Sequence, residues 1–312
     1  MCHEQDRRPR RIAVLVFDGV RTLDVTGPVE VFDVAKALGC AYDVRLYSTA
    51  DATTVRCSSG LTFAAIPISE LTAEADTLLV PGGECLVAQV IPHHLRRSIE
   101  THARTARRIA SICAGSFALA ATGLLDGRRA TTHWRHLDTL AARYPAVRIE
   151  RESIYTHDGA VWTSAGVAAG IDLALALVSD DHGAAVAQEI SKDLVVLSRR
   201  MEGHPQISVA ARTPRPKHPE LERLLATVNS DPAGNYDLDT VAVRIGISPR
   251  HLSRLFKAQV GVTLHQYVQE VRLENAVSLV LAGESFHAAA RRSGLRDGAR
   301  VRDHLSAHGA AV

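Results

Sequence analysis

One cysteine, at a predicted strand-to-helix junction, is the residue of this 312-residue chain best placed for covalent chemistry. Cys113 lies in SICAGSFALA, after the apolar run RIASI and before a helical pattern. A thiol at such an elbow lies beside a helix N-terminus, which favours the thiolate and offers N–H donors to an oxyanion. A small buried cysteine would be inert instead, because cysteine is among the most buried residue types. Spacing alone leaves both interpretations open.

Other segments could complete a site around this cysteine. Asp24 lies in LDVTGPVEVF, and Gly83 ends the Gly-Gly turn that follows the apolar run LLVP. His133 follows in TTHW, three residues before His136. Because no carboxylate or third histidine has metal-ligand spacing with this histidine pair, we expect no metal site and no cofactor.

The ionisation of the cysteine depends on its acidic neighbour. A helix N-terminus favours a thiolate, whereas an ionised carboxylate disfavours it, because like charges repel. The two effects agree only if Asp24 is protonated and donates a hydrogen bond to the sulfur. We therefore predict a Cys113 thiol of unusual acidity, the most reactive of the five cysteines.

A second set of residues points to nucleic acid. In SPRHLSRLFKAQV, Arg250, Arg254 and Lys257 recur at i, i+4 and i+7, so they share one face of a predicted helix. Leu252 and Phe256 fall on the opposite, apolar face. Because an ordinary solvated helix can carry the same stripe, spacing alone does not establish DNA binding.

The residues before this helix complete a helix-turn-helix pattern. LDTVAVRI has helical apolar spacing, Gly246 ends it, and Ser248 and Pro249 suit the cap and first position of the next helix. In such a unit the second helix lies in the major groove, with its N-terminal residues nearest the base edges. The candidate DNA contacts here are Pro249, Arg250, His251, Ser253, Arg254 and Lys257.

The elements that position these residues differ between the two halves of the chain. Up to about residue 200, short apolar runs alternate with helical patterns, which is typical of a parallel sheet covered by helices. Four prolines then interrupt any helical period, and only short capped helices are predicted beyond them. We predict a tail over residues 1–9, an α/β domain over 10–205, a linker over 206–217 and an all-α domain over 218–312.

Composition narrows the class of protein. The chain is 46% hydrophobic and 22% charged, which is ordinary for a soluble packed protein. No apolar run reaches the ~20 residues of a membrane helix and no signal-peptide pattern is present, so we expect a cytoplasmic protein without a membrane partner. Five scattered cysteines without a CxxC pair argue against a disulfide framework or a zinc ribbon. The net charge of +2 does not itself indicate nucleic acid.

Residues 218–309 resemble the DNA-binding domain of the AraC/XylS family of transcription regulators. SPRHLSRLFKAQVGVTLHQYVQEVRLENAVSLVL matches the first helix-turn-helix and the connecting helix of that family, and SFHAAARRSGLRDGARVRDHL matches the second. The resemblance implies two helix-turn-helix units and a double-stranded DNA operator. It adds Arg296 and Arg300 of the second unit to the candidate DNA contacts.

The second unit departs from the pattern of the family. Leu295 and Leu305 stand where phenylalanines are usual. A shift of the first unit by 49 positions replaces Arg254 by Asp303, and its other two basic positions by alanine and serine. We therefore predict a thinner core and a weaker phosphate-binding face in the second unit, with most base-specific contacts made by the first.

Residues 10–200 resemble the DJ-1/PfpI superfamily, which has the class I glutamine amidotransferase-like fold. The motifs are LDVTGPVEVF, LLVPGG, ICAGSFALAATGLLDGRRATTHW and TSAGVAAGIDLAL. The resemblance implies a flavodoxin-like parallel sheet sandwiched by helices. It matches the candidate pocket residues Cys113 (elbow cysteine), Asp24 (acid bonded to the thiol), Gly83 and Ala114 (pocket amides) and His133 (role variable). Isocyanide hydratases have threonine where this chain has Ala114.

The two resemblances together describe the GlxA-like transcription regulators. They imply a sequence-specific DNA-binding regulator, not an enzyme, whose N-terminal domain dimerises and senses a small-molecule effector or a thiol modification. One alternative is a cysteine-dependent hydratase- or amidase-like enzyme that uses Cys113, and another is a redox or electrophile sensor. The basic stripe separates these alternatives, because a pure enzyme has no need of it.

Overall fold

The computed structural model describes residues 9–72, 74–196 and 200–307. Residues 1–8 of the predicted tail and residues 308–312 of the predicted C-terminal domain lie outside these ranges. The chain divides into two compact units, residues 1–202 and 203–312, close to the predicted end of the first domain at 205. The predicted linker contains a helical turn, α8 (Val209–Arg212), and Val209 is buried in the core of the second unit.

A seven-stranded sheet forms the centre of the described part of the first unit, in the order β10-β11-β7-β6-β1-β2-β5. Neighbouring strands are parallel, except that β10 runs antiparallel to β11. The central strands β6, β7 and β11 are buried along their whole length, as expected for a parallel sheet covered on both faces. The strands are β1 (Arg10–Val16), β2 (Tyr42–Ser48), β5 (Ile66–Pro67), β6 (Thr77–Val80), β7 (Arg108–Ile112), β10 (Tyr155–Asp158) and β11 (Val161–Ser164).

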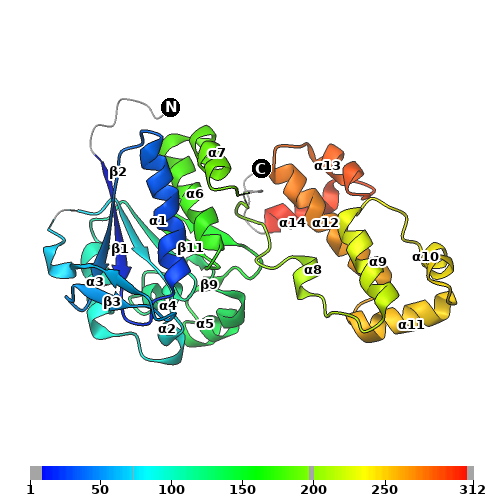
Figure 1. The fold of residues 1–312 in the computed structure, drawn as a ribbon, viewed down its shortest axis with the longest axis horizontal. Coiled ribbons are helices and arrows are strands. Elements are labelled where there is room, and N and C mark those ends of the chain that lie inside the picture. Colours follow the sequence, from blue (N-terminus) through cyan, green and yellow to red (C-terminus); the bar gives the residue numbers. More distant parts are fainter. Residues whose placement is uncertain (1–8, 73, 197–199, 308–312) are drawn as a thin grey trace. The chain divides into compact units, whose positions relative to one another are not determined.

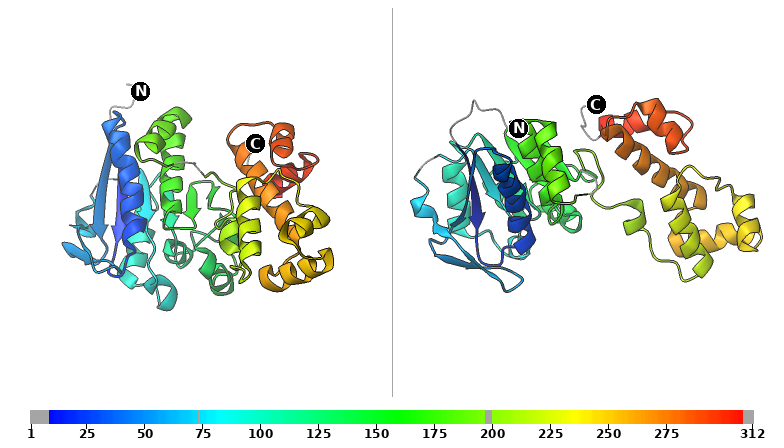
Figure 2. Two further views of the ribbon diagram at one scale, coloured as in Figure 1. Left: turned by 45° about the vertical axis from the view of Figure 1, so that its right-hand side comes forward. Right: turned by 45° about the horizontal axis from the view of Figure 1, so that its top comes forward.

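Helices cover both faces of this sheet (Figures 1 and 2). Helices α1 (Thr22–Ala37), α6 (Ala169–His182) and α7 (Ala184–Asp193) pack together on one face. Helices α2 (Cys85–Ala88), α3 (His93–His102) and α4 (Gly115–Ala120) pack together on the other. This arrangement confirms the predicted flavodoxin-like α/β fold. The smaller elements are β3 (Thr54–Arg56), β4 (Thr62–Ala64), a 3-10 turn (Ile68–Glu70), β8 (Arg129–Ala130), a second 3-10 turn (Trp134–His136), α5 (Leu137–Arg143) and β9 (Arg148–Ile149).

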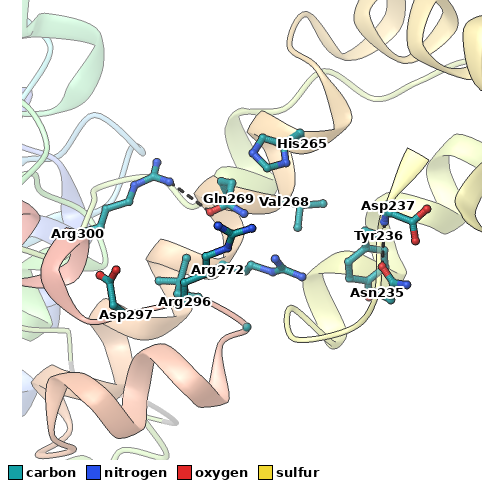
Figure 3. Close-up of a pocket in the computed structure, with 12 residues that line it drawn as sticks. Asn235, Tyr236, Asp237, His265, Val268, Gln269, Arg272, Arg296, Asp297 and Arg300 are labelled. Carbon is teal, nitrogen blue, oxygen red and sulfur yellow. Dashed lines mark hydrogen bonds between the residues drawn. The ribbon is translucent and has the colours of Figure 1, made fainter. Parts of the chain in front are cut away.

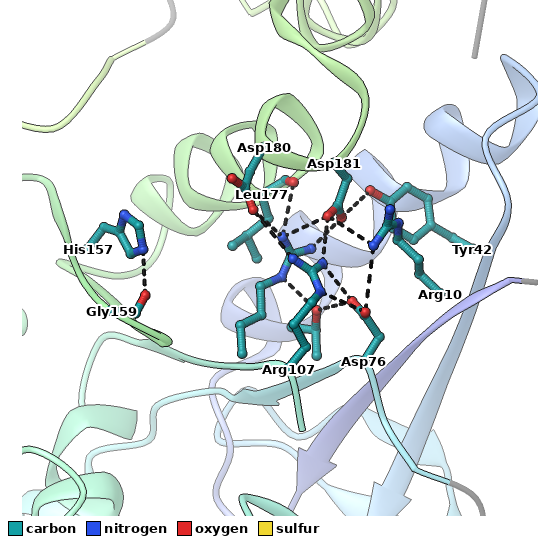
Figure 4. A network of polar contacts seen from close by, with 11 residues as sticks. Arg10, Tyr42, Asp76, Arg107, His157, Gly159, Leu177, Asp180 and Asp181 are labelled. Carbon is teal, nitrogen blue, oxygen red and sulfur yellow. Dashed lines mark hydrogen bonds and ion pairs between the residues drawn. The ribbon is translucent and has the colours of Figure 1, made fainter. Parts of the chain in front are cut away.

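A buried ionic network lies at the end of the sheet where strands β1, β6 and β7 begin (Figure 4). The Arg108 guanidinium, 2% exposed, donates to Asp181 at 2.5 Å, and the carboxylate of Asp181 is 1% exposed. Arg107 bridges Asp181 and Asp76 at 2.6 and 2.8 Å, and the Tyr42 hydroxyl donates to Asp181 at 2.7 Å. Asp181 lies in the last turn of α6. The network therefore holds this helix against the amino-terminal ends of the strands, whereas Cys113 follows the carboxyl end of β7.

The second unit is helical in its described residues, which confirms the predicted all-α domain. Helices α10 and α11 form the first helix-turn-helix, α12 connects, and α13 and α14 form the second. Two clusters of buried apolar residues form the core, one under each helix-turn-helix. The helices are α9 (Pro219–Ser230), α10 (Leu238–Ile245), α11 (Pro249–Val260), α12 (Leu264–Leu281), α13 (Phe286–Arg292) and α14 (Ala299–Ala307).

Candidate cysteine site and nucleic-acid interface

Cys113 occupies a strained backbone position between β7 and α4. Its φ is +54°, in the left-handed region that residues other than glycine seldom adopt. The Cys113 N–H donates to the Ser164 carbonyl at 3.0 Å. The hydroxyls of Ser116 and Thr132 donate to the Cys113 carbonyl at 3.1 and 2.9 Å. Strain of this kind costs about 1–3 kcal/mol and persists only where the surroundings hold the conformation. The predicted elbow is therefore present.

Glycines let the neighbouring backbone close tightly around the elbow. A Cβ at Gly82 would lie 2.6 Å from the Ala114 nitrogen and 2.8 Å from the Cys113 Cβ. A Cβ at Gly166 would lie 2.1 Å from the Cys113 Cβ, so no side chain fits at either glycine. Gly83 meets a different segment, because a Cβ there would lie 2.6 Å from the Gly19 carbonyl oxygen, and its role as a pocket amide remains a prediction.

Asp24 is the buried acid of the site. Its Oδ1 accepts the N–H of Val167 at 2.9 Å, and its Oδ2 accepts the N–H of Gly82 at 3.1 Å. The carboxyl also interacts with the Cys113 thiol, which lowers the pKa of the carboxyl. Burial raises the pKa of Asp24, against these hydrogen bonds and the charge of Arg21, which lower it. The predicted protonated state of this carboxyl remains a prediction.

The predicted acidity of the thiol is wrong for this arrangement. Burial, followed by the charge of Asp24, raises the pKa of the Cys113 thiol to about 12. The Ala114 N–H and the charge of Arg21 lower this pKa, but they do not offset the burial. Cys113 is only 3% exposed. The cost of desolvating a thiolate therefore outweighs the stabilisation that the N-terminus of the short helix α4 provides. Protonation of Asp24 would remove the charge repulsion, but burial would still raise the pKa of the thiol.

His133 lies in the segment next to the elbow. Its Nδ1 accepts the N–H of Arg135 at 3.4 Å, at the start of a short 3-10 turn. Burial, and then the nearby His136, lowers the pKa of His133 to about 4, so this imidazole is neutral at pH 7. The segment is joined to the elbow through Thr132, whose hydroxyl donates to the Cys113 carbonyl.

Several residues of the site were not identified from the sequence, among them Val167 and Arg21. Val167, with a φ of +52°, donates its N–H to Asp24. Arg21 donates its backbone N–H to the Gly82 carbonyl at 2.8 Å, and its charge lowers the pKa of Asp24. Val167 lies inside the quoted motif TSAGVAAGIDLAL, and Arg21 lies two residues before LDVTGPVEVF, which is the one signal that could have found them. A valine side chain has no polar or reactive group that would mark it as a site residue, and the positive φ of Val167 is visible only in the structure.

Two classes of feature are absent from the described ranges. No three or more His, Cys, Asp or Glu side chains come together there in a group that could hold a metal ion. None of the helices in those ranges combines the length and the hydropathy that a membrane-spanning segment requires.

The first helix-turn-helix has the predicted caps at its turn. Helix α10 is ended, as predicted, by the C-cap Gly246, which has a φ of +78°. Its N-cap is Asp237, which was not predicted and whose carboxylate accepts the N–H of Thr240 at 2.9 Å. The N-cap of helix α11 is Ser248, whose hydroxyl accepts the N–H of His251 at 3.3 Å, and Pro249 is in the first helical position. Because each cap satisfies backbone groups left free at a helix end, the turn between the helices is defined locally.

Helix α11 buries its apolar face and exposes its basic face. Leu252 and Phe256 are fully buried. The three basic side chains of the predicted stripe are exposed, and none forms an ion pair within the residues that the structure describes. Of the predicted contacts of this unit, Arg250, His251, Ser253, Arg254 and Lys257 are exposed and Pro249 is half-buried. Their roles as DNA contacts remain predictions.

The second helix-turn-helix has the same geometry with smaller core residues. Helix α13 is capped by the Ser285 hydroxyl, and Gly294 forms the turn with a φ of +74°. Its helices bury Ala289, Val301 and Leu305. Since the first unit buries a phenylalanine and a leucine at its second helix, this core is thinner, in agreement with the prediction.

The outer face of the second unit carries fewer cations. Helix α14 exposes Asp303 and Ser306 where α11 exposes Arg254 and Lys257. Arg296 and Arg300, the two predicted contacts, are exposed. The side chain of Arg300 donates to Gln269 of α12 at 3.4 Å, so it turns toward the helix that connects the two units.

Comparison with known protein families matches the two parts of the chain separately. The DJ-1/PfpI family matches residues 10–180, more than half of the chain, which include Asp24 and Cys113. A helix-turn-helix domain matches residues 241–308, which include all of α11 and α14. The order of the two matches is the one that the sequence predicted.

Individual relatives agree with this division. The HTH-type transcriptional regulator GbdR of Pseudomonas aeruginosa is 27% identical over 277 residues, which span 88% of this chain and 75% of that protein. The isonitrile hydratase of Pseudomonas putida is 34% identical over 185 residues, 59% of this chain and 77% of that protein. The crystal structure of an AraC family transcriptional regulator from Pseudomonas putida shares the fold, with a TM-score of 0.53 at 23% identity over 60% of this chain and 100% of that chain. The chain therefore belongs to the DJ-1/PfpI family and carries a C-terminal helix-turn-helix domain of the AraC type, the arrangement of the GlxA-like regulators.

Proposed function

We propose that this chain is a sequence-specific DNA-binding transcription regulator whose DJ-1/PfpI domain responds to a small-molecule effector. The basic face of α11 carries the proposal, because Arg250, Arg254 and Lys257 are exposed without carboxylate partners in the described residues. Guanidinium groups in this position can read guanine edges in the major groove, and an ammonium can contact phosphate. The long match to GbdR, a protein named as an HTH-type transcriptional regulator, supports the same function.

The state of the cysteine favours sensing by contact over sensing by oxidation. Oxidation and alkylation proceed through the thiolate, and a thiol with a pKa of about 12 is almost wholly neutral at pH 7. In this proposal the effector contacts the neutral thiol and the neutral His133 and does not oxidise the sulfur. Cys113→Ser should therefore leave basal DNA binding intact and weaken the response to the effector.

A homodimer formed through the DJ-1/PfpI domain is part of the proposal. Two linked DNA-binding domains bind two half-sites with a high effective concentration, which compensates for the weaker second helix-turn-helix of each chain. Sedimentation equilibrium of the full chain tests the oligomeric state. A monomer at micromolar concentration would remove this part of the proposal and leave the rest.

Selection of duplexes from a random pool at physiological salt tests the function as a whole. We expect the full-length chain to recover one defined sequence, and the Arg250→Ala/Arg254→Ala variant to lose it. The matched control is Arg97→Ala/Arg104→Ala, which removes the same charge from exposed positions of the first unit. Recovery of unrelated sequences by the unmodified chain would contradict the proposal.

A cysteine-dependent hydratase or amidase is the second candidate function. The elbow at Cys113 and the 34% identity to the isonitrile hydratase of Pseudomonas putida favour it. The raised thiol pKa and the alanine at position 114 count against it. Incubation with an isocyanide or an amide decides between the candidates: turnover that Cys113→Ser abolishes would place the domain among enzymes, and turnover no greater than that of Cys113→Ser supports the regulator.

A further inference from the structure

An open groove of about 390 Å³ lies on the first unit, and none of the residues of the Cys113 site lines it. Four helices or their ends form its walls: residues 88–91 at the end of α2, Arg96 of α3, Ala121 after α4, and Arg143 and Tyr144 at the end of α5. The volume falls within the range of about 300–1,000 Å³ that is typical of small-molecule sites. The groove is therefore large enough for a small ligand.

One wall of the groove is apolar. Val90 is 91% exposed, the largest exposed fraction among the large apolar side chains that the structure describes. The buried Ile91 and the half-buried Ala121 and Tyr144 line the same groove. A single exposed apolar residue is ordinary on a protein surface. A valine that lines a groove together with other apolar groups instead offers surface that a ligand can cover.

The groove also contains a guanidinium that is held in place. Arg143 donates to the Val87 carbonyl at 2.8 Å, and its guanidinium lies over the ring of the buried Phe117, 5.3 Å from the ring centre. These contacts orient the group and use one of its five N–H donors. Within the described ranges Arg143 forms no ion pair, so no carboxylate balances its charge there.

The other charged groups of the groove leave this charge in place. Arg96 also lines the groove, but it pairs with Glu100 of the same helix at 2.8 Å. None of the described residues that line the groove is acidic. A larger cleft of the second unit, of about 620 Å³, differs in this respect, because Asp237 and Asp297 line it beside its arginines (Figure 3). The groove of the first unit therefore offers an anion a positive charge without a competing carboxylate in its walls.

The apolar wall and the guanidinium together indicate the chemistry of a ligand. The planar fork of a guanidinium matches a carboxylate, which accepts two parallel N–H bonds. A bare inorganic anion would leave the apolar wall in water, and a neutral apolar molecule would leave the N–H donors of Arg143 unused. The best match is a small ionised carboxylic acid whose carboxylate is attached to an aliphatic or aromatic group.

We propose that this groove is a second ligand site of the first unit, and that it binds a small carboxylate with an apolar body. The carboxylate pairs with Arg143, and the apolar body packs against Val90 and Tyr144. The site is distinct from the Cys113 pocket and does not rest on the proposed function. Phe117, beneath the guanidinium, belongs to α4, which begins two residues after Cys113, so the two sites share one helix.

Titration of the full-length chain with phenylacetate, followed by NMR, tests the site. We expect saturable binding in the millimolar range or tighter. Phenylacetamide has nearly the same shape without the charge, and it should bind at least about tenfold more weakly, because the charge-assisted hydrogen bonds are lost. Acetate should also bind more weakly than phenylacetate, because it has no ring to bury.

Two substitutions at Val90 separate the effect of charge from that of shape. Because the residue is 91% exposed, neither should change the thermal stability of the chain. Val90→Asp places a carboxylate in the wall and should weaken phenylacetate binding by about two- to fivefold. Val90→Lys adds a positive charge at the same position and should not weaken binding.

Substitution of Arg143 removes the proposed partner of the carboxylate. Arg143→Gln should weaken phenylacetate binding at least about tenfold and leave phenylacetamide binding unchanged. Arg143→Lys, which keeps the charge without the planar fork, should fall between the two. The matched control is Arg104→Gln, which removes an exposed arginine of the same unit outside the groove and should leave binding unchanged.

Four results would overturn the proposal. The first is the absence of saturable phenylacetate binding in the millimolar range. The second is an equal loss in Val90→Asp and Val90→Lys, which would show that the wall does not respond to charge. The third is binding that Cys113→Ser removes and Arg143→Gln preserves, which would place the ligand in the Cys113 pocket. The fourth is equal affinity for acetate and phenylacetate, which would reduce the groove to a site for a bare anion.

Discussion

The ionisation of Cys113 gives the most direct test of how the first unit works. Alkylation proceeds through the thiolate, so its rate follows the ionised fraction. With a pKa of about 12, about 1 thiol in 10,000 is ionised at pH 8, against about 1 in 10 for a thiol at the ordinary pKa of 9.0. Ionisation alone therefore makes Cys113 react about 1,000-fold more slowly than a free thiol, and burial of the sulfur slows it further.

Peptide mapping of the folded chain after timed iodoacetamide treatment measures this rate. We expect the rate at Cys113 to rise about tenfold per pH unit across neutral and mildly alkaline pH, without a plateau. The half-buried Cys85, whose pKa burial also raises, serves as the internal reference. Asp24→Asn should speed the labelling only in part, because burial is the larger cause of the raised pKa at Cys113.

The same variant needs a stability control. An asparagine would turn an N–H donor toward one of the two backbone N–H groups that Asp24 now accepts, which costs about 1–3 kcal/mol. A urea titration shows whether labelling occurs in the folded state. A plateau in the labelling rate of the unmodified Cys113 below about pH 8 would refute the reasoning. It would show a stable thiolate and restore oxidation as the signal.

Three further predictions concern separate parts of the chain. The Arg250→Ala/Arg254→Ala variant should lose about 1–3 kcal/mol of discrimination at each base pair read, measured by competition with single-base operator variants; unchanged operator affinity would contradict it. Gly166→Ala should abolish normal folding of the first unit, because its Cβ would lie 2.1 Å from the cysteine Cβ. Gly246→Ala, at a φ of +78° with open space around it, should cost only about 1 kcal/mol; equal losses in thermal melts would refute the contrast. Asp181→Ala should lower the free energy of unfolding by about 3–5 kcal/mol in urea titrations, because it leaves a buried guanidinium without its closest carboxylate; a loss well under 1 kcal/mol would show that water reaches the network.

The sequence by itself determined the features that depend on neighbours along the chain. Ser248 and Gly246 mark the ends of α11 and α10, because a cap acts on N–H and carbonyl groups within one turn. The exposed face of α11 follows from the helical period, and the elbow follows from an apolar strand that meets a helical pattern. These predictions needed no long-range contact, and each agrees with the structure.

Only the tertiary structure decided the chemistry of Cys113 and the pairing of the buried charges. The thiol pKa depends on burial beneath segments far apart in the sequence, those of Asp24, Gly82 and Gly166. Desolvation sums over everything packed around a group, so a helix N-terminus read from the sequence gave the wrong sign for the shift. The buried ionic network likewise forms only because Arg108 meets Asp181, 73 positions later. Local sequence patterns specify helix caps and the apolar and polar faces of a helix. Burial and the pairing of distant charges arise only when the chain has folded.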